Sequence, residues 1–170
     1  MGQIIIRRGT PADTEAFIRL LAEVRQGMTN KEWFYLDPPE DVREMMESGV
    51  MTLWVAMDGD RLAGAFDSLT PVLEEYNYGC QLGFSQEELQ KVIHMDTAAV
   101  HPDYRGQHLQ RRLLQAAEAD LSGSGEKHLL CTIHPDNIYS LQNALAQGYT
   151  IQKTLPLYGS VRHILRKDIF

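Results

Sequence analysis

Three arginines surround the predicted start of a helix in the stretch VHPDYRGQHLQRRLL, which covers residues 100–114. Downstream apolar residues recur at helical spacing: Leu109, Leu113, Leu114, Ala117 and Leu121. This spacing predicts an amphipathic helix that begins near His108. The first turn of a helix exposes unpaired backbone N–H groups and the positive end of the helix dipole, so Arg111 and Arg112 stand where a cation is mildly unfavourable. A bound anion would offset this charge, which makes the stretch a candidate phosphate site.

The residues just before this helix favour the same interpretation. Arg105 can add a charge-assisted contact to a phosphate, and Gly106 permits close approach of the backbone to a ligand. The stretch lacks the Gly-Lys-Ser/Thr of a Walker loop and the Gly-x-Gly-x-x-Gly of a dinucleotide fold. The alternative interpretation is that the three arginines are solvated surface residues.

A second group of reactive side chains stands in the preceding stretch VIHMDTAAV, residues 92–100, which is predicted to be a strand. Because side chains alternate across a strand, His94, Asp96 and Ala98 share one face. An imidazole and a carboxylate side by side can exchange protons with a substrate. They can equally be a hydrogen-bonded polar pair of the core.

The elements that must position these groups follow from hydrophobic periodicity and turn residues. Strands are predicted over residues 3–8, over a hairpin at 50–69 that turns at Asp58-Gly59, and over 92–100, 127–133, 149–155 and 161–167. Helices are predicted after Thr10-Pro11, over 39–48 with a cap at Gly49, from His108, and after Asp136 or Asn137 up to Gly148, with a helical turn within 85–92. Residues 156–160 are predicted to connect the last two strands. The order is β-α-α-β-β-β-α-β-α-β-β, which indicates one α/β (or α+β) domain over residues 1–170.

Composition limits the function further. The chain is 44% hydrophobic and 23% charged, as is typical of a globular protein, and its formal net charge of −7 argues against a broad nucleic-acid surface. Cys80 and Cys131 form no Cys-x-x-Cys pair, so we expect neither a disulfide framework nor a metal site, with Cys131 a buried apolar residue. No signal peptide and no apolar run of about 20 residues is present, so a cytoplasmic protein without membrane attachment is expected.

The stretch VHPDYRGQHLQ resembles the acetyl-CoA loop of the GNAT superfamily of N-acetyltransferases, usually written Arg/Gln-x-x-Gly-x-Gly/Ala. The preceding DTAAV, the order of elements, and a later group of residues resemble that superfamily as well: Asn137, Ser140, Gly148 and Tyr149. The resemblance covers essentially the whole chain. It implies a mixed, mostly antiparallel sheet with helices on both faces and a splayed central pair of strands.

The resemblance implies that the loop holds the pyrophosphate of acetyl-CoA through its backbone N–H groups. Arg105 and Gly106 match the first two motif positions, whereas His108 stands where glycine is usual and Gln110 where glycine or alanine is usual. The implied cofactor residues are Ala98, Ala99, Val100, Arg105, Gly106, Gln107, His108, Leu109, Gln110, Arg111, Arg112 and Asn137. Of these, Ala98–Val100 would contact pantetheine through the backbone, and Asn137 would cap a helix or bind pantetheine.

Catalysis in this superfamily usually needs a base for the amine and an acid for the departing thiolate. The resemblance places the base on the strand with Asp96, and His94 is the second candidate. The tyrosine that often serves as acid would fall on Ala144, so Tyr158 is the remaining candidate if its connection folds inward.

The acceptor end of such a site would be lined by two segments that combine aromatic and acidic residues. They comprise Trp33, Phe34 and Tyr35, and then Glu74, Glu75, Tyr76 and Tyr78. This combination suits a cationic amine. A hydrophobic clamp with solvated glutamates is the alternative.

The expected function is transfer of an acetyl group from acetyl-CoA to a primary amine of a small molecule or peptide, without a metal. Partners are expected to be neither nucleic acid nor membrane, and a homodimer is one option. The alternative is a non-catalytic domain of the same fold that binds an acyl-CoA as a sensor or structural ligand.

Overall fold

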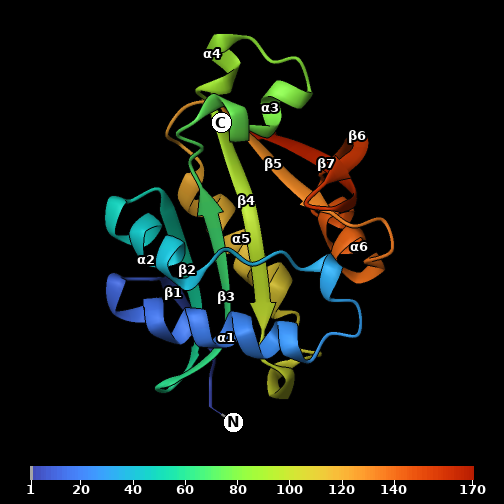
Figure 1. Cartoon of the computed structure of the whole chain (residues 1–170). Coiled ribbons are helices and arrows are strands. Elements are labelled where there is room, and N and C mark those ends of the chain that lie inside the picture. Colours follow the sequence, from blue (N-terminus) through green and yellow to red (C-terminus); the bar gives the residue numbers. More distant parts are fainter. Residues whose placement is uncertain (1) are drawn as a thin grey trace. The chain divides into compact units, whose positions relative to one another are not determined.

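A computed structural model describes residues 2–170 and contains the predicted elements in the predicted order (Figure 1). The strands are β1 (Ile5–Arg8), β2 (Met51–Asp58), β3 (Arg61–Leu69), β4 (Val92–Val100), β5 (Lys127–Ile133), β6 (Thr150–Leu157) and β7 (Ser160–Ile169). The helices are α1 (Thr14–Gln26), α2 (Pro39–Ser48), α3 (Tyr78–Gln81), α4 (Gln86–Leu89), α5 (Leu109–Leu121) and α6 (Ile138–Ala146). Neighbouring strands follow the order β1-β2-β3-β4-β5-β7-β6 in a mixed, open sheet.

The first of two compact units contains the described residues up to Ser68 together with Thr97–Asp120. Its strand β1 pairs with β2 in an antiparallel register that sets Ile5 opposite Met57. Helices α1 and α2 lie on the near side of these strands in Figure 1, and α5 lies on the far side. Amphipathic helices on both faces bury the sheet, and the fully buried core residues include Phe17, Trp54, Val55, Leu109 and Leu113.

The second unit contains Leu69–Asp96 and Leu121–Phe170. Here β5 pairs with β7, and β7 pairs with β6, both antiparallel. One apolar cluster of this unit comprises Tyr78, Val92, Leu130 and Ile164, with Leu82, Phe84, Leu155 and Leu157 packed against it. The prediction that Cys131 is buried is confirmed. The prediction of one domain over residues 1–170 stays a prediction.

Strands β4 and β5 diverge after a short parallel pairing. The pairing joins Val92–His94 to His128–Leu130, although both strands continue beyond these residues. The main chain of β4 beyond His94 is therefore left without β5 as its ladder partner. This confirms the predicted splayed central pair of strands.

Two local predictions were wrong. The connection predicted over residues 156–160 is only the two-residue turn Tyr158–Gly159, because Pro156 and Leu157 belong to β6. Proline is tolerated there because β6 is an edge strand, where one side of the backbone has no ladder partner. The short helix α3 lies in a segment for which no element was predicted, since four residues are too few to show a helical period.

Within residues 2–170, no helix is both long and apolar enough to cross a membrane. In the same residues, no group of three or more His, Cys, Asp or Glu side chains is arranged to hold a metal ion.

Gly64 of β3 should resist substitution because the backbone of β4 lies close to it. A Cβ atom there would lie 3.1 Å from the Ala99 carbonyl oxygen and 3.3 Å from Leu113 Cδ1. We predict that Gly64→Ala lowers the free energy of unfolding by about 1–3 kcal/mol, measured by denaturant titration. Gly27→Ala is the control, since its Cβ would meet nothing closer than 3.7 Å and its φ is −79°. Equal stability of the two variants would contradict the prediction.

Candidate functional site

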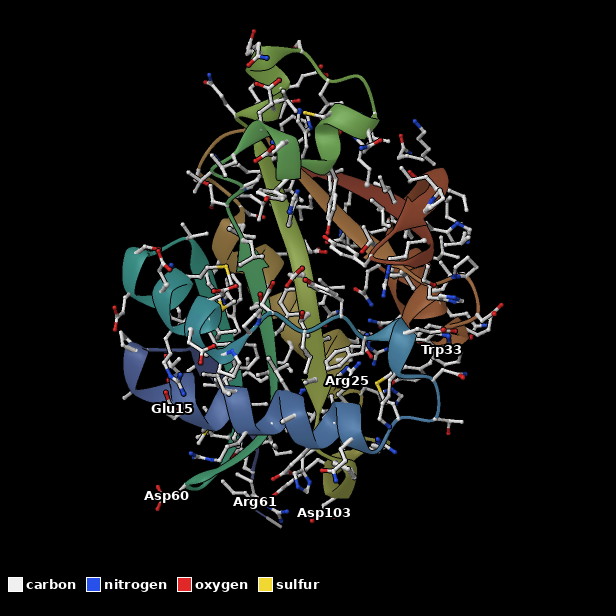
Figure 2. All side chains as sticks on the ribbon, in the orientation of Figure 1. Glu15, Arg25, Trp33, Asp60, Arg61 and Asp103 are labelled. Atoms are coloured by element: carbon white, nitrogen blue, oxygen red, sulfur yellow. The ribbon has the colours of Figure 1, made fainter. Side chains whose placement is uncertain are left out.

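The loop that precedes α5 is fastened to the β2–β3 hairpin within the first unit. The Tyr104 hydroxyl is buried and donates to Asp58 Oδ2 at 2.8 Å. Arg61 and Asp103 lie side by side in Figure 2, and the Arg61 guanidinium donates to Asp103 Oδ2 at 2.6 Å. These contacts join residues more than 40 positions apart, and they fix the loop before it reaches the arginine-rich segment.

The loop then turns through the left-handed region of backbone space twice. Gly106 has φ +81°, and a Cβ atom there would meet nothing within 4 Å, so glycine is required by the backbone angle and not by lack of space. His108 has φ +57°, a conformation that costs a residue with a side chain roughly 1–2 kcal/mol. Its position is the one where the GNAT loop usually has glycine, and the backbone angle gives the physical reason for that glycine.

Helix α5 starts directly after this turn, at Leu109, which confirms the predicted start near His108. The first hydrogen bond across it runs from the Arg112 N–H to the His108 carbonyl at 3.0 Å. Four N–H groups at this helix start donate to no main-chain carbonyl among residues 2–170: those of Gly106, His108, Leu109 and Arg111. Available N–H donors at a helix start are suited to an anion.

The three arginines do not play equivalent parts in the structure. Arg105 and Arg111 are exposed beside the helix start. The Arg112 guanidinium donates to the Ile4 carbonyl at 3.3 Å, which ties α5 to the residue that precedes β1. Arg105 and Arg111 are therefore the stronger candidates for phosphate contact, and Arg112 has a main-chain partner already.

The remaining predicted cofactor residues lie on β4 and α6. Ala99 is buried, and Ala98 and Val100 are half-buried on the last part of β4. Asn137 occupies the N-cap position of α6, but its side chain makes no capping hydrogen bond. Their contacts with a cofactor stay predictions.

In the second unit, Tyr78 and His94 form a tightly packed pair. Their rings stack with centroids 4.0 Å apart and an angle of 18° between the planes. The Tyr78 backbone N–H donates to His94 Nε2 at 3.2 Å, so the lone pair of that nitrogen is already used. Burial lowers the pKa of His94 to about 4, which makes the ring neutral at pH 7.

Asn77 fixes the start of α3 by accepting from the Gly79 N–H at 2.9 Å and donating to the Leu89 carbonyl at 3.0 Å.

Tyr158 joins this pair from the β6–β7 turn. Its hydroxyl is hydrogen-bonded to the Tyr78 hydroxyl, although the residue as a whole is 47% exposed. Its φ of +55° places a tyrosine at the first position of a two-residue hairpin turn, where asparagine, aspartate or glycine is favoured. The backbone thus accommodates an unfavourable residue type at this position.

Arg162 of β7 is the cation of the group and is only 4% exposed. Its guanidinium carbon lies 5.7 Å from the centre of the Tyr158 ring. Burial lowers the pKa of Arg162, whereas Tyr78, Tyr158 and Asp96 act to raise it. Asp96 is exposed on β4, so the group combines a buried cation, two phenols and an exposed carboxylate.

The structure brings Tyr158 together with Tyr78 and His94, and it shows two residues that the sequence interpretation missed. Arg162 was not singled out, nor was Thr132, whose hydroxyl is in hydrogen-bonding reach of the Tyr78 hydroxyl. The pairing of β5 with β7 relates these two residues. Ile164 lies opposite Thr132, and Arg162 lies two residues before Ile164 on the same face of β7. Alternation along the two predicted strands would place all of these side chains on one face.

The predicted acceptor residues fall in different units. Trp33, which is labelled in Figure 2, and Phe34 are half-buried, and Tyr35 is 52% exposed, all in the first unit. Arg25 Nε donates to the Phe34 carbonyl at 3.3 Å. Tyr76 is 68% exposed in the second unit. Their contact with an acceptor stays a prediction.

Comparison with known proteins agrees with this geometry. Residues 19–149 match the family model described as the acetyltransferase (GNAT) family. No curated protein matches the chain. A GNAT-family acetyltransferase structure from Streptococcus pneumoniae aligns with a TM-score of 0.73 at 15% identity, covering 99% of this chain and 100% of that one.

Two further similar structures were solved with acetyl-CoA. Arabidopsis thaliana NAA60 in complex with acetyl-CoA aligns with a TM-score of 0.73 at 15% identity, covering 98% of this chain and 99% of its own. The putative acetyltransferase yncA from Salmonella typhimurium, with acetyl-CoA, aligns with a TM-score of 0.69 at 15% identity, covering 99% and 94%. These likenesses establish the fold, and the family match covers most of the chain. The chain therefore belongs to the GNAT family of acetyltransferases.

Proposed function

We propose that this protein transfers the acetyl group of acetyl-CoA to a primary amine. The observation that carries the proposal is the start of α5, where left-handed residues Gly106 and His108 lead into a helix with available N–H groups. Arg105 and Arg111 stand beside these donors. A pyrophosphate with several negative charges matches this arrangement of dipoles and cations. The splay of β4 from β5 after His94 supports binding of pantetheine along the freed strand.

Asp96 is the better candidate for the base. A base must carry a lone pair toward the amine, and His94 Nε2 already accepts the Tyr78 N–H within a buried stack. The Asp96 side chain is exposed, so its carboxylate can meet an amine or a bridging water. A carboxylate also attracts the cationic form of the acceptor before the proton is lost.

Tyr158 is the candidate for the acid. The thioester supplies an activated acetyl carbon; the amine nitrogen bonds to it and the C–S bond breaks. Tyr158 would give its hydroxyl proton to the sulfur, while Asp96 takes the proton from nitrogen. The acceptor is proposed to be a cationic amine of a small molecule or peptide, attracted by Asp96 and the exposed Glu74 and Glu75.

The proposed function is tested by incubating the protein with acetyl-CoA and a panel of polyamines, amino acids and peptides, with free thiol as the readout. We expect turnover with at least one amine. Asp96→Asn should lower kcat at pH 7 by on the order of 10²-fold while leaving the Kd for acetyl-CoA unchanged. Thermal stabilisation by acetyl-CoA without turnover on any amine would show a non-catalytic acyl-CoA-binding domain. No stabilisation at all would overturn the assignment.

His108 should be replaceable by glycine without loss of the cofactor. Glycine relieves the left-handed strain, and part of that gain is offset by its larger entropy in the unfolded chain. We predict that His108→Gly raises the free energy of unfolding by up to about 1 kcal/mol and binds CoA at least as tightly by calorimetry. His108→Ala keeps the strain and serves as the matched control. If both variants lost CoA affinity equally, the imidazole itself would contact the phosphate.

The buried His94 predicts a dependence of stability on pH. Its pKa is about 4 in the folded chain and 6.5 in the unfolded one, so between these values the unfolded state binds more protons. The contribution of His94 to the free energy of unfolding is therefore complete above pH 6.5. It falls by roughly 3 kcal/mol as the pH drops to about 4. The variant His94→Gln keeps an acceptor for the Tyr78 N–H. In urea titrations, its free energy of unfolding should depend less on pH between about 4 and 6.5 than that of the wild type. An unchanged slope in the variant would show that other groups cause the loss.

A further inference from the structure

His101 joins the end of β4 to the cofactor loop, and it is held on both sides. Its backbone N–H donates to the Ala63 carbonyl of β3 at 2.9 Å, and its carbonyl accepts the Tyr104 N–H at 2.9 Å. Its side chain accepts the Asp103 N–H at Nδ1, at 3.1 Å, and so caps the short 3₁₀ turn that follows. This turn ends at Tyr104, two residues before the left-handed Gly106. The imidazole of His101 therefore helps to set the course of the chain into the loop.

The hydrogen bond from the Asp103 N–H defines the protonation state of the ring. A backbone N–H can only donate, so Nδ1 of His101 must carry a lone pair. The neutral imidazole then has its proton on Nε2, and a doubly protonated ring cannot make this contact. The side chain is 20% exposed, so the ring can exchange protons with solvent. The contact therefore exists only while His101 is neutral.

The same contact occurs at the other His-Pro-Asp sequence of the chain. In the second unit, the Asp136 N–H donates to His134 Nδ1, also at 3.1 Å. In both places the sequence brings the imidazole to the N–H two residues later. The contact is therefore favoured by the local sequence.

Charged and polar groups of α1, β3 and the loop face the His101 ring. Glu23 Oε2 of α1 lies 3.4 Å from Nε2, and Asp103 Oδ2 lies 3.8 Å from Nδ1. Arg61 Nη2 of β3 lies 3.4 Å from Nε2 and donates to Asp103 Oδ2 at 2.6 Å (Figure 2). The Tyr104 ring meets the imidazole edge to face, with ring centres 6.1 Å apart. Each ring nitrogen thus has a carboxylate oxygen within 4 Å that can accept a proton from it.

Protonation of Nδ1 would change both contacts that hold the loop at Asp103. The Asp103 N–H would lose its acceptor, and the new Nδ1–H would be directed to the Asp103 carboxylate. The hydrogen bond from Arg61 holds the pKa of this carboxyl below its usual range, so it remains an anion at mildly acid pH. Arg61 and the protonated His101 would then compete for one carboxylate. The anchoring of the loop therefore depends on the charge of His101.

We propose that His101 is a positioning residue of the cofactor loop, which holds the loop ready for CoA while it is neutral and releases it on protonation. The proposal rests on the proposed acetyltransfer, in which this loop binds the pyrophosphate. His101 acts through the turn that it caps and not by contact with the cofactor. Because imidazoles titrate between about pH 5 and pH 8, CoA should bind more weakly at the acid end of this range.

Calorimetry with CoA at pH 8 and at pH 5.5 tests the proposal. His101→Asn places an amide oxygen where Nδ1 was, so the variant still accepts the Asp103 N–H but never becomes charged. We expect its Kd at pH 8 to stay within about 2-fold of the wild-type value. Between pH 8 and pH 5.5, the Kd of the wild type should rise about 3- to 10-fold more than that of His101→Asn. Using the variant as the reference removes the titration of the CoA phosphates and of His108 from the comparison.

His101→Leu is the matched variant without an acceptor, since it places a methyl group at the same point. We expect its Kd at pH 8 to be about 5- to 10-fold above the wild-type value. Its dependence on pH should equal that of His101→Asn. An equal dependence of Kd on pH in the wild type and in His101→Asn, or wild-type affinity of His101→Leu at pH 8, would overturn the proposal.

An amide NMR titration without ligand separates this proposal from the acetyltransferase assignment. In ¹⁵N-labelled protein, the Asp103 amide resonance of the wild type should move between pH 8 and pH 5.5, whereas that of His101→Asn should stay in place. If the wild-type resonance moves no more than that of the variant, the positioning contact is wrong and acetyltransfer is untouched. If it moves but CoA gives no heat at either pH, the acetyltransfer assignment fails while the contact stands.

Discussion

The backbone of residues 106–108 must pass through left-handed conformations immediately before α5 begins. This constraint decides which groups the loop can present. A helix entered in this way keeps the N–H groups of its first turn clear of main-chain acceptors, and the β2–β3 hairpin fixes the approach through Tyr104 and Asp103. The exposed Arg105 and Arg111 then surround donors that already attract an anion. The proposed ligand of opposite charge would account for cations at a helix start.

A left-handed backbone angle at a residue with a side chain also occurs in the second unit. Among residues 2–170, His108 and Tyr158 are the non-glycine residues with positive φ. At each position, glycine would relieve the backbone strain. Each residue is also part of a proposed site, His108 in the cofactor loop and Tyr158 as the candidate acid. Local strain that persists in this manner is typical of functional positions. At Tyr158 the compensation comes from the Tyr78 hydroxyl and the Arg162 guanidinium.

Much of this fold could be predicted from periodicity. Strands β4 and β5 have the predicted bounds because each is an apolar run closed by residues that break it, and α5 starts where its apolar spacing does. The glycine of the loop motif was expected to permit close approach of a ligand, whereas its left-handed φ of +81° was not predicted. The resemblance carried by residues 100–110 led to the family that the whole chain matches.

The group around Tyr158 could not be predicted in the same way. Its hydroxyl partner Tyr78 is 80 residues away, and a local pattern contains no information on such a contact. The connection was predicted over residues 156–160, whereas the edge position of β6 allows the strand to continue through Pro156. Arg162 would be placed at the surface by its charge, and only the packing of the second unit buries it.

The central claim is that main-chain N–H groups at the start of α5 bind the pyrophosphate of the cofactor. An ¹⁵N amide NMR titration with CoA measures this directly. The account predicts saturable downfield shifts of the Gly106, His108, Leu109 and Arg111 amides, larger than those of amides in the fastened segment around Tyr104. Amide resonances at these positions that stay unmoved at millimolar CoA would contradict it.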